Sequence, residues 1–451
     1  MSEDQLVRAV GEWRRPGLAL AEALAGAVRE AVLDGRLRTG SALPAERRLA
    51  AVLGVSRGTV TAALSRLRDD GWVRTRHGSA STVRLPARAA ERFAPVSASG
   101  EGRSLDLRRA VPAAPRSVYL AATERALARM APLLSQDGEP GAGLPELRSL
   151  VAERYTREGL PTRPEQILVT SGTRAALALL CAQLRPRVAA VEIPTFFDAL
   201  HVLRGAGARL VGCRVTTEGW DLDQLDDALR AARGGLAYLV PDFQNPTGAL
   251  MTARTRRAVA GLAARYGVCL VVDETMRDLD LRDAVGPEPR IRSAVLIGSA
   301  AKAVWGGLRV GWIRSSAGLI GELSGNALCG PLSAAPMQQM IAVELLGDPD
   351  PVLRRRQAEL RRQRDHLSGL LAGDDRWRFT VPPGGLALWL RLTGVRSDVV
   401  VERARAHRID LSSGPRFAAD ATLTHHLRVP YTPPVPALDH IAAALDEVCR
   451  D

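Results

Sequence analysis

The first part of the chain repeats apolar residues at helical spacing. Leu20, Leu24, Val28 and Val32 recur at steps of four and predict one amphipathic helix within residues 18–36. The stretch DGRLRTGSALP that follows is rich in turn-forming residues. We therefore expect the helix to end there.

Two more helices and a hairpin are predicted after this turn. Pro44 suits the first turn of a helix over PAERRLAAVL, and Gly54 suits its C-terminal end. Ser56 is a favourable N-cap for the next helix, RGTVTAALSRLRDD. The segment WVRTRHGSASTVRL holds two short β-type runs around HGSA, which predict a hairpin. This order of elements is typical of a winged helix-turn-helix.

In that motif the N-terminal residues of the second helix of the pair reach base edges in the major groove. Polar residues at this end, arginines of the preceding helix and basic residues of the hairpin are therefore candidates for contacts with bases and phosphates. They are Ser56, Arg57, Gly58, Thr59, Thr61, Arg47, Arg48, Arg76 and His77. A structural three-helix module with a solvated arginine face is the alternative interpretation.

Residues 34–81, DGRLRTGSALPAERRLAAVLGVSRGTVTAALSRLRDDGWVRTRHGSAS, resemble the winged-helix domain of the GntR family of bacterial regulators. The resemblance implies binding to double-stranded DNA and places Arg47, Arg57 and the pair His77–Gly78 at contact positions. The family often has a basic residue where this chain has Thr61. That departure bears on the operator sequence and not on DNA binding itself.

Residues 85–104 read LPARAAERFAPVSASGEGRS and show no hydrophobic period. Alanine, proline, serine and glycine dominate, which predicts a flexible connector. We therefore expect a DNA-binding domain over 1–84, a connector over 85–104 and a second domain over 105–451.

From about residue 165 onward, β-branched runs alternate with helical segments. The runs are QILVT, VAAVEI, ARLVGCRV, LAYLV, VCLVV and SAVLIG. This alternation predicts an α/β domain with a mostly parallel sheet and helices on its faces. Ligands of such sheets bind beyond the carboxyl ends of the strands, so the loops after the runs are the candidate site.

Three of these loops carry polar residues that are candidates for ligand binding. TSGTRAAL places Ser171 to Arg174 at a helix N-terminus, which favours phosphate, although small residues there often serve only as caps. Asn245 in PDFQNPTG precedes a proline, and a plain turn is its alternative. Asp273 ends an apolar strand, and a buried acid needs a cationic partner such as a protonated pyridine nitrogen or an arginine.

The chain contains 60 arginines and a single lysine, Lys302, within GSAAKAVWGGLRVG. A lysine amine can lose its proton and attack a carbonyl, whereas a guanidinium stays charged. Chance retention at a surface site is the alternative. Ser299 precedes the lysine and Arg309 follows it. A Schiff-base lysine, an aspartate for a pyridinium and a phosphate cradle are the groups that pyridoxal 5′-phosphate uses.

TSGTRAAL, VPDFQNPTG, VVDE, SAAK and GLRVG occur in the order typical of fold-type-I aminotransferases, and the resemblance runs from about 105 to 450. It implies a pyridoxal-phosphate-dependent transferase fold with a smaller C-terminal α+β subdomain at about 375–451. It also implies that Lys302 holds the cofactor as an aldimine, that Asp273 pairs with the ring nitrogen and that Asn245 binds the ring hydroxyl.

The same resemblance implies further contacts. Phe196 would stack on the ring, and Arg428 in HHLRVPYT would bind the carboxylate of an effector or substrate. The phosphate would be held by Gly172, Thr173, Arg174, Ser299 and Arg309.

Two family tyrosines are missing. Thr275 and Met276 stand where a tyrosine usually follows the aspartate, and DGEPGAG lacks the tyrosine of the family's glycine-rich stretch. A GntR-type domain fused to this fold is similar to the MocR subfamily of transcriptional regulators. The resemblance implies a homodimeric regulator that senses pyridoxal phosphate, an amino-compound effector, or both. An active aminotransferase with a vestigial DNA-binding domain is the alternative, and weak transaminase activity is compatible with either.

Charge and cysteine usage agree with this interpretation. The formal net charge is +12, and residues 1–90 hold 15 arginines against 9 acidic residues, which favours a polyanionic partner. The five cysteines are odd in number and lack any CxxC pair, which favours reduced thiols in a cytoplasm over a disulfide frame or a metal site. With no apolar run of 18 residues, we expect no membrane span.

Overall fold

The structure is a computed structural model that describes residues 3–11, 13–14, 17–33, 36–75, 81–84, 86, 104–135, 137–138, 141–283 and 286–450. The predicted connector lies outside the described residues, apart from Pro86 and Ser104. Within the described ranges no helix is long and apolar enough to cross a membrane.

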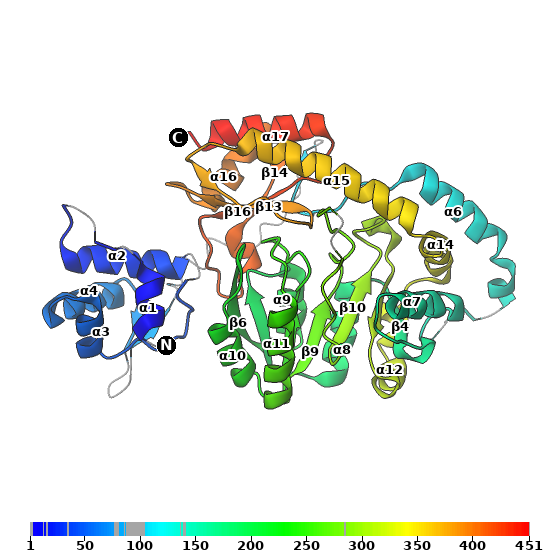
Figure 1. The fold of residues 1–451 in the computed structure, drawn as a ribbon, viewed down its shortest axis with the longest axis horizontal. Helices are drawn as coiled ribbons and strands as arrows, with labels where there is room; N and C mark the ends of the chain where they lie inside the picture. The colour runs from blue at the N-terminus through cyan, green and yellow to red at the C-terminus, as the bar shows by residue number, and fades with distance from the viewer. Residues whose placement is uncertain are drawn as a thin grey trace.

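The described residues of the N-terminal domain form four helices and a short hairpin (Figure 1). They are α1 (Glu3–Val10), α2 (Leu20–Leu33), α3 (Glu46–Leu53), α4 (Arg57–Asp69), β1 (Val73–Arg74) and β2 (Thr82–Val83). The two strands pair antiparallel with Val73 opposite Val83, so the predicted hairpin is present. Arg76, His77 and Gly78, between the two strands in the sequence, lie outside the described residues.

One apolar core holds this domain together. Leu24, Val28 and Val32 of α2 are buried in it, as the helical spacing predicts. Leu20 is 44% exposed, contrary to its place on the predicted apolar face. It is the first residue of α2, and the buried face begins only at Ala23, so the first turn lies beyond the core. The spacing did not predict α1, which packs on α2 and α3 and buries Leu6.

The large domain is built on an eight-stranded sheet in the order β4-β11-β10-β9-β8-β5-β6-β7. The strands β5, β6, β8, β9 and β10 run parallel, whereas β11 is antiparallel to both of its neighbours and β7 to β6. The strand bounds are β4 (Ile167–Thr170), β5 (Val188–Ile193), β6 (Arg209–Thr216), β7 (Gly219–Trp220), β8 (Leu236–Leu239), β9 (Cys269–Asp273), β10 (Val295–Ser299) and β11 (Gly311–Arg314).

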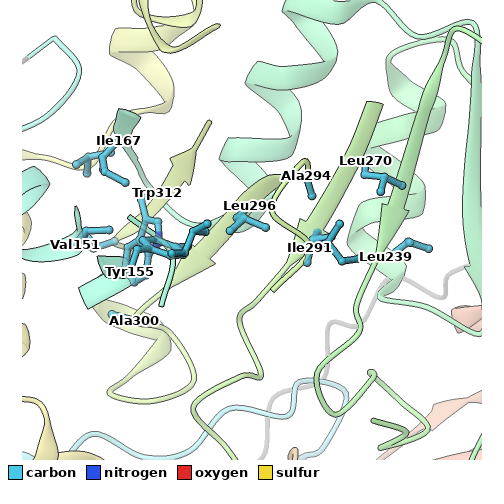
Figure 2. Close-up of a cluster of buried hydrophobic side chains, with 14 of the residues drawn as sticks. Val151, Tyr155, Ile167, Leu239, Leu270, Ile291, Ala294, Leu296, Ala300 and Trp312 are labelled. Atoms are coloured by element: carbon cyan, nitrogen blue, oxygen red, sulfur yellow. The ribbon is translucent and has the colours of Figure 1, made fainter. Parts of the chain in front are cut away.

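Alternate residues of the strands enter two separate cores, because successive side chains of a strand point to opposite faces. Leu239, Leu296 and Trp312 belong to one core, part of which is drawn in Figure 2. Tyr238 and Ile297, which neighbour these residues in sequence, belong to the other. Helices therefore cover both faces, which confirms the predicted fold class. They are α7 (Pro145–Arg157), α8 (Thr173–Leu184), α9 (Phe197–Gly205), α10 (Leu222–Ala231), α11 (Ala253–Tyr266), α12 (Ala317–Ser324), α13 (Cys329–Leu332) and α14 (Pro336–Leu346).

The smaller α+β part packs a four-stranded antiparallel sheet, β12-β13-β16-β15, against helices. The long helix α15 leads into it and lies beside the C-terminal helix α17 (Figure 1). The bounds are α15 (Asp350–Leu371), β12 (Trp377–Arg378), β13 (Ala387–Leu392), α16 (Ser397–Ala404), β14 (Ile409–Asp410), β15 (Ser412–Ser413), η5 (Gly414–Phe417), β16 (His426–Pro430) and α17 (Val435–Val448).

The chain enters the second domain through this smaller part. The strand β3 (Leu105–Asp106), directly after the connector, pairs in parallel with β14. Residues 107–115 then run toward the large sheet, and α6 (Arg116–Ala128) and η1 (Ala131–Ser135) follow. Segments at opposite ends of this domain's sequence are thus joined beside the ends of the large-sheet strands.

Candidate cofactor, effector and DNA sites

The carboxyl ends of the large-sheet strands open into one cavity of about 410 Å³. Lys302, which follows β10, and Asp273, at the end of β9, both line it. The other sequence-predicted cofactor residues that line the same cavity are Gly172, Thr173, Arg174, Phe196, Asn245, Ser299 and Arg309. The structure therefore brings the whole predicted cofactor set together around one space.

Glycine makes a close backbone approach possible at one wall of the cavity. A Cβ atom on Gly311 would lie 2.7 Å from the Cα atom of Gly172. The backbones at these two positions are therefore too close for a side chain on Gly311. Gly172 has a φ of 122°, a conformation that other residues rarely adopt, and it precedes the first turn of α8. The backbone N–H groups at that helix start are suited to a phosphate group.

Lys302 donates a hydrogen bond from Nζ to the backbone oxygen of Ala110 over 2.7 Å. Burial, together with the positive charges of Arg428 and Arg109, lowers the pKa of Lys302 to about 7. The carboxylates of Asp273 and Asp198 oppose this shift. Near neutral pH a large share of the amine is therefore unprotonated and able to act as a nucleophile.

Asp273 is 4% exposed, and hydroxyl groups hold both of its carboxylate oxygens. Oδ2 accepts a hydrogen bond of 2.7 Å from the phenol of Tyr238, and Oδ1 accepts bonds from the backbone N–H and the hydroxyl of Thr275. Burial raises the pKa of Asp273, and these hydrogen bonds act in the opposite direction because they favour the charged form. The carboxylate is thus oriented toward the cavity.

Arg428, the expected carboxylate ligand, is 2% exposed and does not line the cavity. Its Nη2 donates to the backbone oxygen of Arg108 over 2.6 Å, and its Nη1 lies 3.4 Å from Oδ1 of Asn245. The Nε atom has no partner within the described part of the chain. Burial lowers the pKa of Arg428 to about 9. A carboxylate reaches Arg428 only if the Arg108 carbonyl moves aside.

Ser299 differs from the expectation in one respect. Its hydroxyl donates to the backbone oxygen of Val310 and accepts from the backbone N–H of Ala301. The hydroxyl must exchange the Val310 oxygen for a phosphate oxygen if it is to donate to a cofactor.

Four polar or charged cavity residues had no prediction from the sequence: Arg109, Asp198, Tyr238 and Arg416. The arginines lie among 60 others, so residue type carried no signal. Tyr238 is the polar-tipped residue of the otherwise apolar run LAYLV, and this was the one available sign.

The predicted DNA-contact residues of the helix pair lie on the surface of α3 and α4. Ser56 caps α4 by accepting from the N–H of Thr59, as expected, so its hydroxyl is partly occupied. Thr61 donates to Glu46 and is also engaged. Arg47 and Arg57 are exposed and make no ion pair with any described residue. Their charges are therefore available for a partner.

The two domains touch at a loop of the smaller α+β part. Thr39 donates a hydrogen bond of 3.1 Å to the carboxylate of Asp420, and the backbone N–H of Leu423 bonds to the oxygen of Leu33 at the end of α2. The contact residue Asp420 is three residues after Phe417 in the sequence. The centre of the Phe417 ring lies 4.7 Å from the guanidinium carbon of Arg428.

Comparisons with known proteins follow the same division of the chain. The sequence-family model of class I and II aminotransferases matches residues 104–445. The sequence-family model of bacterial regulatory proteins of the gntR family matches residues 20–83. A solved structure similar to this chain is that of LysN, an alpha-aminoadipate aminotransferase from Thermus thermophilus. It has a TM-score of 0.70 and 25% identity, over 80% of this chain and 97% of the other.

Among curated relatives, the uncharacterized HTH-type transcriptional regulator YisV of Bacillus subtilis is 27% identical over 399 residues, 80% of this chain and 82% of the relative. The 2-aminoadipate transaminase of Thermus thermophilus is 28% identical over 68% of this chain and 81% of its own. The probable rhizopine catabolism regulatory protein MocR of Rhizobium meliloti is 28% identical over 63% of each chain. The chain therefore belongs to the class I and II aminotransferase family, preceded by a gntR-type helix-turn-helix domain, which is the architecture of the MocR subfamily of regulators.

Proposed function

We propose that this protein is a cytoplasmic, DNA-binding transcriptional regulator that binds pyridoxal 5′-phosphate and an amino-compound effector in its aminotransferase-like domain. The observation that carries the proposal is the position of residues 108–110. Their backbone oxygens bind Lys302 and Arg428, the two groups expected to hold cofactor and effector. The segment itself begins four residues after the connector to the DNA-binding domain.

The residues present suit the cofactor. When bound, pyridoxal phosphate supplies an aldehyde for an amine and a ring that withdraws electrons. The helix start at Thr173 suits the phosphate, Asp273 suits a protonated ring nitrogen, and the unprotonated amine of Lys302 suits the aldehyde carbon. Asn245 faces the same cavity with a side chain that can donate to the ring hydroxyl.

Ligands and the backbone oxygens of Arg108 and Ala110, which follow the connector, compete for the same two side chains. Lys302 releases the Ala110 oxygen when it takes a ligand partner, and Arg428 releases the Arg108 oxygen when it takes a carboxylate. Both releases free the segment that leads to the connector. The shift between the two arrangements is limited by the difference in ligand affinity for them.

A homodimer is part of the proposal. A helix-turn-helix reads paired half-sites as a dimer. The chain also leaves Leu120, Leu127 and Leu134 50%, 63% and 74% exposed along α6 and η1, at steps of seven residues. A second subunit that covers this face removes the apolar surface from water.

The second candidate is a working aminotransferase, favoured by the assembled Lys302 and Asp273 pair and by the similarity to a 2-aminoadipate transaminase. The test is footprinting on the DNA upstream of its own gene, with and without pyridoxal phosphate. We expect protection of paired half-sites whose strength changes with the cofactor. No protection in either condition, together with steady turnover of an amino acid and a 2-oxo acid, would support the enzyme instead.

A further inference from the structure

The charges that face the cavity do not balance. Lys302 and four arginines, Arg109, Arg174, Arg309 and Arg416, line it, against two carboxylates, Asp198 and Asp273. Arg174 lies 3.6 Å from Asp198, which forms one pair. If the site binds as proposed above, the phosphate takes Arg309 and the helix start, and Asp273 takes the ring nitrogen. Arg109 and Arg416 are left without an anionic partner.

Arg416 lies over an aromatic ring, and no carboxylate of the described residues is within ion-pair distance of it. Its guanidinium carbon lies 4.0 Å from the centre of the Phe197 ring, and it makes no hydrogen bond or ion pair with any described residue. The side chain is half-buried, and this burial lowers the pKa of Arg416. A partly desolvated cation costs free energy unless an anion meets it. The missing partner is therefore expected to come from a ligand.

Two aromatic rings in edge-to-face contact lie between Arg416 and Arg428. Arg428 lies over Phe417 at 4.7 Å, Phe417 meets Phe197 edge-on at 5.9 Å between ring centres, and Arg416 lies over Phe197. The two guanidinium groups therefore each lie over one ring of the same aromatic pair. Each positive charge disfavours the charged form of the other, and the charge of Arg416 is among the causes that lower the pKa of Arg428.

We infer that the effector is an amino acid with an acidic side chain, whose α-carboxylate meets Arg428 and whose second carboxylate meets Arg416. The inference rests on the proposed function, because the amino group must approach Lys302 in the same cavity. A ligand with two carboxylates can pair with both Arg428 and Arg416. An amino acid with a neutral side chain leaves Arg416 unpaired. Arg109, exposed at the same rim, adds to the attraction of the second carboxylate.

The test titrates the cofactor-loaded protein with L-glutamate, L-glutamine, L-aspartate and L-asparagine and follows the cofactor absorbance. Each acid differs from its amide by one charge. We expect the acid of at least one pair to bind about tenfold or more tightly than its amide, since hydrogen bonds between charged groups are about twice as strong as neutral ones. The variant Arg416→Gln is expected to remove this preference while leaving the affinity for pyridoxal phosphate unchanged.

The control variant is Arg362→Gln, which removes the same charge from an exposed position of α15 outside the cavity. It is expected to keep the wild-type preference. Equal binding of acid and amide by the wild type, or an unchanged preference in Arg416→Gln, overturns the inference and leaves the proposed function intact. If no amino acid alters the absorbance or the melting temperature of the loaded protein, effector binding at this site fails and the inference fails with it.

Discussion

Tyr238 and Asp273 lie on neighbouring parallel strands, and the Tyr238 phenol donates a 2.7 Å hydrogen bond to Oδ2 of the carboxylate. The sequence lacks the tyrosine that usually follows the aspartate in this family, and Thr275 binds the other carboxylate oxygen instead. The aspartate is therefore held by hydroxyl groups on both sides. Its orientation toward the cavity depends on β8 as much as on its own strand.

Tyr238→Phe should weaken cofactor binding, because loss of the donor raises the pKa of Asp273 and lets its carboxylate turn. We expect an affinity for pyridoxal phosphate about three- to tenfold lower, the value of one net hydrogen bond. Absorbance titration measures it. Tyr266→Phe is the matched control, since the Tyr266 phenol also bonds an aspartate, Asp226, but outside the cavity. Equal affinities in both variants would show that the Tyr238 bond is structural only.

Lys302→Arg should abolish the visible absorbance of the lysine-bound cofactor. Arginine keeps the positive charge but cannot form a covalent bond to the aldehyde. Spectra of protein mixed with equimolar pyridoxal phosphate and then dialysed measure the loss. A retained band in this variant would place the cofactor on another group.

The capture of cofactor by Lys302 should depend on pH around neutrality. The pKa of Lys302 is about 7, so the rate should rise about tenfold per pH unit below 7 and level off above it. Stopped-flow absorbance measures the rate. In Arg428→Gln a positive neighbour that lowers this pKa is gone, so the midpoint should move to higher pH. An unchanged midpoint would mean that the charge of Arg428 does not contribute to the value.

The same shift affects the stability of the cofactor-free protein. The folded-state pKa lies below the unfolded value of 10.5, so the unfolded chain binds more protons between these pH values. The free energy of unfolding should therefore gain from this group as pH rises from about 7 toward 10.5. Relative to wild type, Lys302→Met should be most stabilising below pH 7 and progressively less so above it. Urea unfolding at several pH values measures the difference.

Arg57→Ala should weaken operator binding, because Arg57 is an exposed, unpaired cation at the first residue of the predicted recognition helix. A loss of about 1–3 kcal/mol is expected if it contacts a base, and a uniform loss across sequences if it contacts only phosphate. Gel-shift titrations at two salt concentrations separate the cases. Arg362→Ala, far from this helix in sequence, should bind DNA as the wild type does.

Thr39→Val should reduce the response of DNA binding to ligand. The substitution removes the hydrogen bond between the N-terminal domain and Asp420 without changing side-chain volume much. One such bond changes the equilibrium between arrangements by about three- to tenfold. The ratio of operator affinities with and without pyridoxal phosphate measures the effect. A ratio equal to that of wild type would mean that the bond between Thr39 and Asp420 does not carry the signal.

The sequence by itself determined the two kinds of domain and nine candidate cofactor residues, all of which line the cavity. The spacing of apolar residues predicted α2, and turn residues predicted the pair α3 and α4. Motifs after the strands indicated Asp273, Asn245 and Lys302. These signals are visible in the sequence because apolar spacing and turn-forming residues are local properties. The single lysine among 60 arginines pointed to its own position.

Only the tertiary structure decided which of the many arginines face the site. Arg416 reaches the cavity because η5 and α9 bring it over Phe197, and Arg108 and Ala110 reach Arg428 and Lys302 because β3 pairs with a strand about 300 residues later. Such contacts depend on how distant elements pack, and no local period encodes them. The link between the ligand site and the connector is therefore a property of the folded chain.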